Sequence, residues 1–198
     1  ILATALWECG LPDQAAAVMA NRLDVLEHSG TPEAVLLGFR TLARMAAAEG
    51  SEHRALELLA ALDAMGQSRG LLRLRLISLA EQVRLHARRY RADTCRSLCA
   101  HMDALLAQAE PAHGPIWLRQ SRLLADVAHA HAALAAQQWA AAEAAFARAD
   151  AGAQAVRMGR LHIEMLALRA FVRHRQGQPA QDLLREAVDL ADVYGLQK

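Results

Sequence analysis

Apolar residues recur three and four positions apart along almost the whole chain, which is the spacing of one helix face, as in ALELLAAL at 55–62. Glycine and proline stand between these segments and mark where one helix ends and the next begins. Gly30, for example, is followed by Thr31 and Pro32, which fit an N-cap and a first helical residue. The predicted helix stops are Gly10, Gly30, Gly50, Gly66 and Gly177.

This pattern predicts ten helices and no sheet. Their expected ranges are 1–9, 13–29, 33–49, 52–65, 70–88, 91–109, 116–136, 139–157, 160–176 and 180–194. The stretch LLRLRLI at 71–77 alternates like a strand, but it continues into SLAEQVRLHARR without a turn signal. A helix is favoured because a lone strand would have no partner.

The helices repeat in pairs. Turns inside successive pairs fall near Gly10, Gly50, Tyr90, Gln138 and Gly177, at intervals of roughly 40 residues with one longer interval that contains EPAHGP at 110–115. The fold class expected from this period is all-α, a right-handed α-α superhelix of about five helix pairs. We expect one domain over residues 1–198, cut from a longer protein.

A small residue follows the turn in three of the pairs. Ala15, Ala55 and Ala142 lie five residues after the turns of the first, second and fourth pairs, where they let two helices approach closely. Trp139 and Phe146 are expected to fill the gap against the next pair. The third pair lacks a turn glycine, and the fifth has aspartate at the small position. In these two pairs the sequence therefore predicts the position of the turn better than it predicts which residue lies at the helix contact.

The segment QQWAAAEAAFARA at 137–149 is similar to the second helix of a tetratricopeptide repeat. The segment 161–195 resembles the repeats of the large ATP-binding, MalT-type regulators of the LuxR superfamily. The residues that carry this second resemblance are Ile163, Glu164, Leu166, Leu168, Gly177, Leu183, Leu184, Glu186, Ala187, Leu190, Ala191 and Gly195. Met165 and Val188 depart mildly from that pattern.

The resemblance implies a sensing domain that lies between an ATP-binding module and a DNA-binding helix-turn-helix and receives a small inducer or a regulatory protein. Neither neighbour lies in this chain, which has no G-x-x-x-x-G-K-[ST] motif. We therefore expect a cytoplasmic, non-catalytic sensor without a cofactor. The alternative is a tetratricopeptide-like scaffold that binds a peptide or a partner domain in its concave groove. No paired catalytic motif favours an enzyme.

Composition narrows the class further. No apolar run approaches the roughly 20 residues that span a bilayer. The three cysteines, Cys9, Cys95 and Cys99, are an odd number that fits reduced thiols better than a disulfide framework. Their spacing, and that of the nine histidines, matches no metal motif, so no metal site is expected.

Basic residues are concentrated after the first third of the chain. Residues 1–68 carry 4 basic and 9 acidic side chains, whereas residues 69–198 carry 18 and 12. Eight arginines lie between Arg69 and Arg96, with Tyr90 as the aromatic residue close to them. A solvated helix face is favoured over a nucleic-acid surface, which would need stacking residues or a recognition helix. Docking onto the acidic first third or onto a neighbouring domain is a further alternative.

Charged residues gather on one stripe of the predicted helix 116–136. In a superhelix the first helix of each pair lines the concave surface, so we expect this stripe and its equivalents in other pairs to face a groove. Arginine and histidine there would favour an anionic ligand or an acidic peptide, although exposed charges on any helix give the same pattern. The candidate residues are Arg40, Arg44, Arg119, Arg122, Asp126, His129, His162, Arg169 and Arg173.

Overall fold

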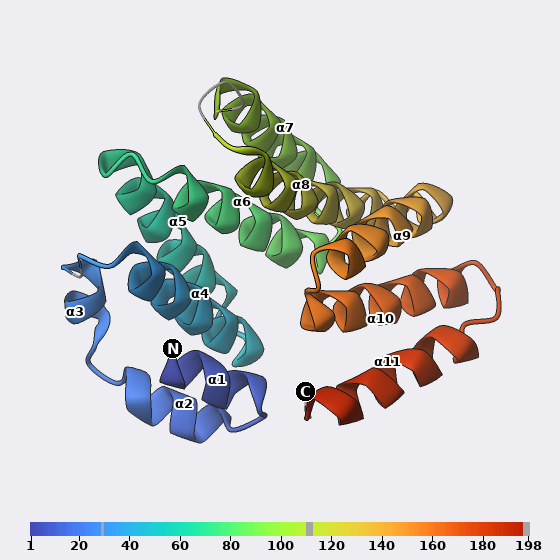
Figure 1. Cartoon of the computed structure of the whole chain (residues 1–198), viewed down its shortest axis with the longest axis horizontal. Coiled ribbons are helices and arrows are strands. Elements are labelled where there is room, and N and C mark those ends of the chain that lie inside the picture. The colour runs from blue at the N-terminus through green and yellow to red at the C-terminus, as the bar shows by residue number, and fades with distance from the viewer. Residues whose placement is uncertain (29, 110–112, 196–198) are drawn as a thin grey trace. The chain divides into compact units, whose positions relative to one another are not determined.

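The computed structural model describes residues 1–28, 30–109 and 113–195, and every regular element in these ranges is a helix. The helices follow one another along the chain as labelled in Figure 1. They are α1 (Leu2–Glu8), α2 (Pro12–Met19), α3 (Leu23–Glu27), α4 (Pro32–Ala48), α5 (Glu52–Ser68), α6 (Leu72–Ala87), α7 (Ala92–Ala109), α8 (Pro115–Ala135), α9 (Trp139–Ala155), α10 (Gly159–Arg175) and α11 (Gln181–Tyr194). The predicted all-α class is confirmed for these residues.

The described chain forms two compact units. One comprises Ile1–Gln82 and the other Val83–Gly195, so the boundary lies inside α6. Such a division is expected when each helix pair contacts mainly its neighbours along the chain. The single domain expected from the sequence stays a prediction.

Nine of the ten predicted helices lie within three residues of their expected ends, but the helix predicted over 13–29 is wrong. That segment breaks into α2 and α3, because Asn21 between them has a φ of 54°. A left-handed residue cannot continue a right-handed helix, and asparagine tolerates this conformation better than most residues. The predicted part that falls on residue 29 lies outside the described residues.

Gly66 does not end a helix, contrary to the prediction. Helix α5 continues to Ser68, and the chain turns at Gly70 with a φ of +66°. Gly66 is buried, and a Cβ built on it would lie 2.7 Å from Cγ of Arg75 on α6. Gly66 therefore allows α5 and α6 to pack closely, and it does not form a turn.

The turns inside the five helix pairs share one backbone geometry, which confirms the predicted period. In each, a residue in the left-handed region ends the first helix, and the N–H of the next residue donates to the carbonyl five positions before it, as Ser51 does to Ala46 at 2.8 Å. This is the Schellman arrangement. The left-handed residues are Gly10 (φ 76°), Gly50 (84°), Tyr90 (54°), Gln137 (56°) and Gly177 (69°).

The small side chains predicted at the helix contacts are completely buried. Ala15, Ala55 and Ala142 each have 0% exposure. Cys95 takes the same place in the third pair, five residues after Tyr90, and it is also 0% exposed. In the fifth pair α11 begins four residues after the turn glycine instead of two, which shifts the register and leaves Asp182 exposed.

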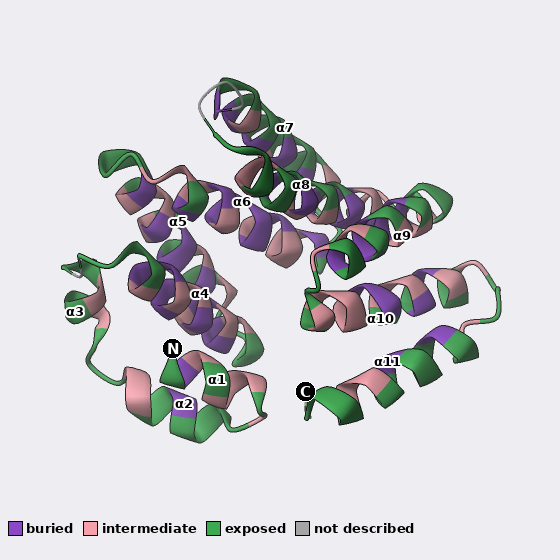
Figure 2. Ribbon diagram, in the orientation of Figure 1, coloured by how far each residue is buried: buried purple, intermediate pink, exposed green. Residues whose placement is uncertain are grey.

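Within the second unit, the buried residues, purple in Figure 2, lie on the facing sides of neighbouring helices. Phe146 packs with residues of α8, α9 and α10, and Trp139 packs at the edge of this cluster, as predicted. The adjacent residues Met165 and Leu166 of α10 belong to different clusters: Met165 joins this one, whereas Leu166 packs against α11 with Leu183. Helix α10 is therefore buried on two sides.

The alternating LLRLRLI stretch is helical, as predicted. Leu74, Leu76 and Leu79 of α6 are all buried, and Ser78 donates to the carbonyl of Leu59 on α5 at 2.6 Å. Burial on more than one side gives apolar positions that do not follow a single helical stripe. The alternation of apolar and polar residues thus arises because α6 is buried on more than one side, and it does not indicate a strand.

The small-residue contact can be tested on α9, where Ala142 is completely buried and Ala144, two residues later, is exposed. We expect Ala142→Leu to lower the free energy of unfolding by about 1–3 kcal/mol, because the larger side chain overpacks the contact. Ala144→Leu should change it by less than about 0.5 kcal/mol. Urea denaturation followed by circular dichroism measures both, and equal effects would contradict the assigned contact.

Candidate functional site

The nine candidate residues fall into three separate sets. Arg40 and Arg44 lie on α4 in the first unit. The α8 set is Arg119, Arg122, Asp126 and His129, and the α10 set is His162, Arg169 and Arg173, both in the second unit. Each set has a different environment, and the sets are described in turn.

The α4 arginines hold a buried carboxylate. Nε of Arg40 lies 2.6 Å from Oε1 of Glu81 on α6, and Nη2 of Arg44 lies 2.6 Å from the same atom. Glu81 is only 7% exposed, and Arg44 also reaches Glu8 of α1 at 3.7 Å. These cations tie α1, α4 and α6 together, so their role in this structure is to pair a buried charge.

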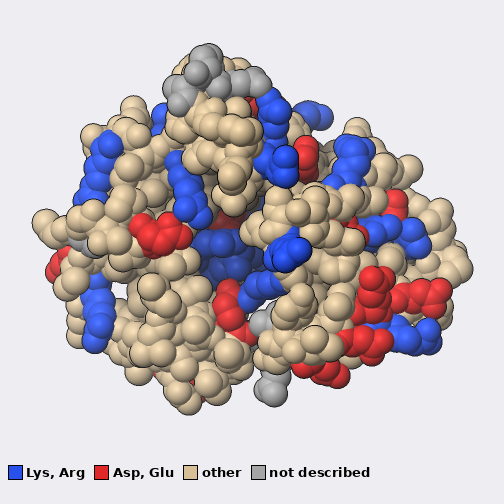
Figure 3. Space-filling model, in the orientation of Figure 1, with Lys and Arg blue, Asp and Glu red and all other residues tan. Residues whose placement is uncertain are grey.

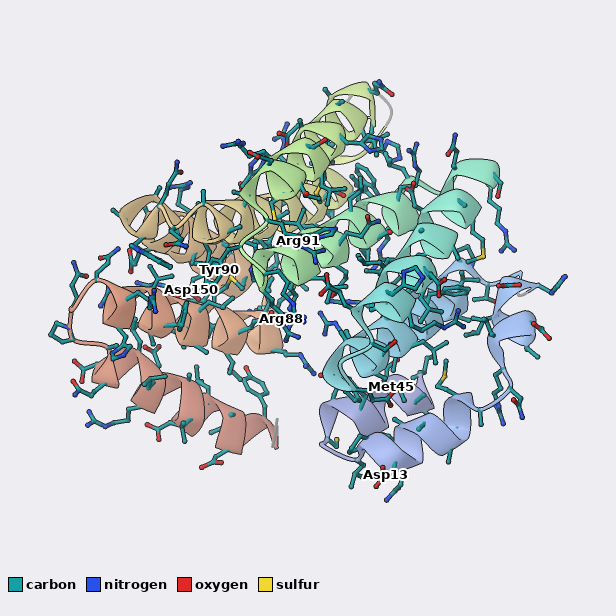
Figure 4. All side chains as sticks on the ribbon, turned by 180° about the vertical axis from the view of Figure 1, so that it is seen from behind. Asp13, Met45, Arg88, Tyr90, Arg91 and Asp150 are labelled. Carbon is teal, nitrogen blue, oxygen red and sulfur yellow. The ribbon has the colours of Figure 1, made fainter. Side chains whose placement is uncertain are left out.

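The three candidate residues of α10 likewise meet carboxylates, which here belong to α9. One of these carboxylates, Asp150, is labelled in Figure 4. Arg169 donates from Nη1 to Asp150 at 2.8 Å, and His162 pairs with the other oxygen of that carboxylate. Arg173 donates from Nε to Glu143 at 3.1 Å. Asp150 is 3% exposed, so these partners offset the cost of burying its carboxylate.

These ion pairs change the interpretation of the predicted electropositive groove. The two arginines of α4 and the three basic residues of α10 each meet a carboxylate of the same unit, which offsets the positive charge that was expected to attract an anion. On the face seen in Figure 3, blue and red side chains are likewise interspersed.

Three of the α8 residues, Arg122, Asp126 and His129, line a cavity of about 400 Å³ between α7 and α8. Arg119 is exposed on the same helix but does not line it. Nε2 of His129 donates to the carboxylate of Asp103 on α7, 3.0 Å from each oxygen. The apolar part of the wall comes from Leu106, Ala107, Leu118 and Ala125.

Asp103 was missed by sequence reasoning, although a signal for it exists. Asp63, Asp103 and Asp150 each lie 13 residues after the left-handed residue of their pair, and each meets a basic side chain on the following first helix. Asp63 does so through Nε of Arg75 at 3.1 Å. An acid at a fixed place in the repeat therefore links one pair to the next.

The equivalent carboxylates differ in how far they are shielded. At the α9–α10 interface the side chains of Asp150, His162 and Arg169 are 4%, 13% and 16% exposed. At the α7–α8 interface those of Asp103 and His129 are 51% and 49% exposed. The same type of ion pair is thus closed in one interface and open to a cavity in the other.

Helix α11 carries no acid at this place. Its residues Leu184, Val188 and Ala191 lie one helical turn apart on the side that is not covered by α10, and the first two are 49% and 59% exposed. The acids of α11 stand elsewhere on the helix and gather along it in Figure 3. They are Asp182, Glu186, Asp189 and Asp192.

The arginine-rich stretch also has partners within the chain. Arg73 pairs with Glu33 at 3.1 Å in the first unit, and Arg84 pairs with Glu164 at 3.2 Å in the second. These ion pairs fit the interpretation of this stretch as helix faces. Its other predicted alternatives stay untested.

Comparison with protein-family models, curated proteins and solved structures finds no match for the chain. The family resemblance drawn from the sequence therefore stays a prediction. Among residues 1–28, 30–109 and 113–195, no group of three or more His, Cys, Asp or Glu side chains is arranged to hold a metal ion. None of the described helices combines the length and apolarity that crossing a membrane requires.

The difference between the two interfaces predicts unequal mutational effects. We expect Asp150→Ala to lower the free energy of unfolding by about 3–5 kcal/mol, because it leaves Arg169, whose side chain is only 16% exposed, without this carboxylate. Asp103→Ala should cost less than about 1 kcal/mol, since that pair is exposed. Urea denaturation of both variants makes the comparison, and similar losses would argue against it.

The buried thiols should be inert. Burial, followed by the charges of Asp103 and Cys95, raises the pKa of Cys99 to about 12, and burial also raises the pKa of Cys95. Both therefore stay protonated well above neutral pH, whereas only the thiolate reacts with alkylating agents. Cys9 is exposed.

We expect iodoacetamide at pH 8 to label Cys9 alone in the folded protein, as mass spectrometry of peptides would show. Unfolding in urea should expose all three thiols to the reagent. The variant Cys9→Ser should leave the folded protein unlabelled, and rapid labelling of Cys99 before unfolding would contradict the assigned burial.

Proposed function

We propose that this chain is the sensing domain of a LuxR-type transcription regulator of the MalT kind, a right-handed helical superhelix without catalytic activity. The observation that carries the proposal is the cavity of about 400 Å³ between α7 and α8. It lies within the size range of small-molecule sites, and charged side chains converge on it from two helices. The repeated hairpins supply the scaffold that such a sensor requires.

The proposed mechanism is a shift of populations. A ligand that contacts both α7 and α8 favours the arrangement in which these helices lie at one fixed spacing. In a repeat array a small change between two pairs is passed on to everything beyond them. The neighbouring ATP-binding and DNA-binding domains of the cytoplasmic regulator would respond to that change, and this segment would not touch DNA.

A metabolite panel in a thermal-shift assay tests the proposal. A ligand at about one hundred times its Kd adds about 2.7 kcal/mol of stability, which raises the unfolding midpoint of a chain of this size by several degrees. We expect at least one small metabolite to do so in proportion to its concentration. If no metabolite acts while an immobilised peptide or partner domain binds the chain, the tetratricopeptide-like scaffold replaces the sensor.

A further inference from the structure

The cavity between α7 and α8 lies where the repeat is irregular. His162 follows Asp150 by 12 residues at the α9–α10 interface, whereas Arg122 follows Asp103 by 19. In both interfaces a second basic residue comes seven positions later, His129 in the open one and Arg169 in the closed one. The interval from the acid to the first basic residue is thus seven residues longer at α7–α8, while the order of charges is kept.

At the open interface these charges line a cavity. The closed one places His162 and Arg169 on Asp150 and Arg173 on Glu143, with side chains that are between 4% and 34% exposed. The open one instead places Arg122, Asp126 and His129 around unfilled space. The charged side chains of the repeat are thus present at this interface too, and a ligand can reach them.

The charges of the cavity are mixed, which argues against the purely anionic ligand expected from the sequence. Two carboxylates, Asp103 and Asp126, face one guanidinium, Arg122, and the imidazole of His129 already donates to Asp103. An anion would meet the two carboxylates as well as the arginine. A ligand that carries both signs satisfies each group through charge-assisted hydrogen bonds.

Apolar side chains complete the wall. Leu106 and Ala107 come from α7, and Leu118 and Ala125 come from α8. Such a surface stabilises an aliphatic or aromatic body by removing it from water. Arg122 and Asp126 are one helical turn apart, so their side chains start roughly 6 Å from each other, a separation that one ammonium and one carboxylate on the same carbon can bridge.

We propose that this cavity binds a small zwitterion with an apolar body, the chemistry of a hydrophobic α-amino acid. The carboxylate of the ligand pairs with Arg122, its ammonium group lies between Asp103 and Asp126, and its side chain packs on Leu106 and Leu118. His129 holds the carboxylate of Asp103 in place. The inference rests on the proposed sensing function and names its ligand class.

The test uses the whole 198-residue chain with leucine and phenylalanine as probes. Isothermal titration calorimetry compares each with its single-charge analogues: isovalerate and isoamylamine for leucine, 3-phenylpropionate and phenethylamine for phenylalanine. We expect the analogues to bind at least about tenfold more weakly, because each lacks one of the two charge-assisted contacts that the zwitterion makes. Analogues that bind as tightly as the amino acids would overturn the zwitterion.

Substitutions on α8 test whether the ligand binds in this cavity. Arg122→Gln and Asp126→Asn should each weaken amino-acid binding by about tenfold or more. Arg119→Gln is the matched control, because Arg119 lies on the same helix outside the cavity wall. Circular dichroism and the unfolding midpoint without ligand establish that all three variants fold. Binding that is unchanged in Arg122→Gln and Asp126→Asn would overturn the cavity as the site.

The remaining outcomes separate the two proposals. If neither amino acid binds but another metabolite does, and Arg122→Gln weakens it, the ligand class is wrong and the sensing function stands. If no small molecule of the metabolite panel binds the chain at all, both the ligand class and the sensing of a small inducer are wrong.

Discussion

The structure depends on one steric constraint: two helices of a pair must approach closely just after a left-handed turn. Four of the five pairs meet it with a completely buried small side chain, Ala15, Ala55, Cys95 or Ala142, five residues after the turn. A larger side chain at that place would separate the two helices before the apolar positions further along could meet. The Schellman turn fixes where the second helix starts, and the small residue then fixes how near it lies.

A second constraint joins one pair to the next. Asp63, Asp103 and Asp150 stand at one place in the repeat and meet basic side chains of the following first helix. Such a link costs desolvation when it is buried and contributes little when it is exposed, so its main effect is to select one register between neighbouring pairs. This link accounts for the pairing of His129, His162 and Arg169 among the predicted groove residues. Arg40 and Arg44 instead pair with Glu81, and Arg173 pairs with Glu143.

The period and the helix class could be predicted from the sequence because turn chemistry and apolar spacing are local properties. The break at Asn21 could not, since nothing in the apolar pattern of 13–29 marks a left-handed residue. Gly66 was misassigned for a similar reason: glycine serves both turns and close packing, and only the position of Arg75 distinguishes them. The position of the helix contact in the fifth pair could not be predicted, because two extra residues precede α11.

The candidate site was predictable only in part, because a stripe on one helix does not reveal what the facing helix contributes. Arg122, Asp126 and His129 were found from α8 alone, whereas Asp103 comes from α7 and changes the charge balance of the cavity. Comparing the repeats with one another shows which residues the facing helix contributes, which the stripe on α8 alone does not show. Equivalent charges lie buried at α9–α10 and half exposed at α7–α8, and the longer connection before α8 is the sequence difference that accompanies this change. An irregular interval in a repeat array is therefore informative about where a binding site can form, because regular intervals bring the same side chains together and fill the space between them.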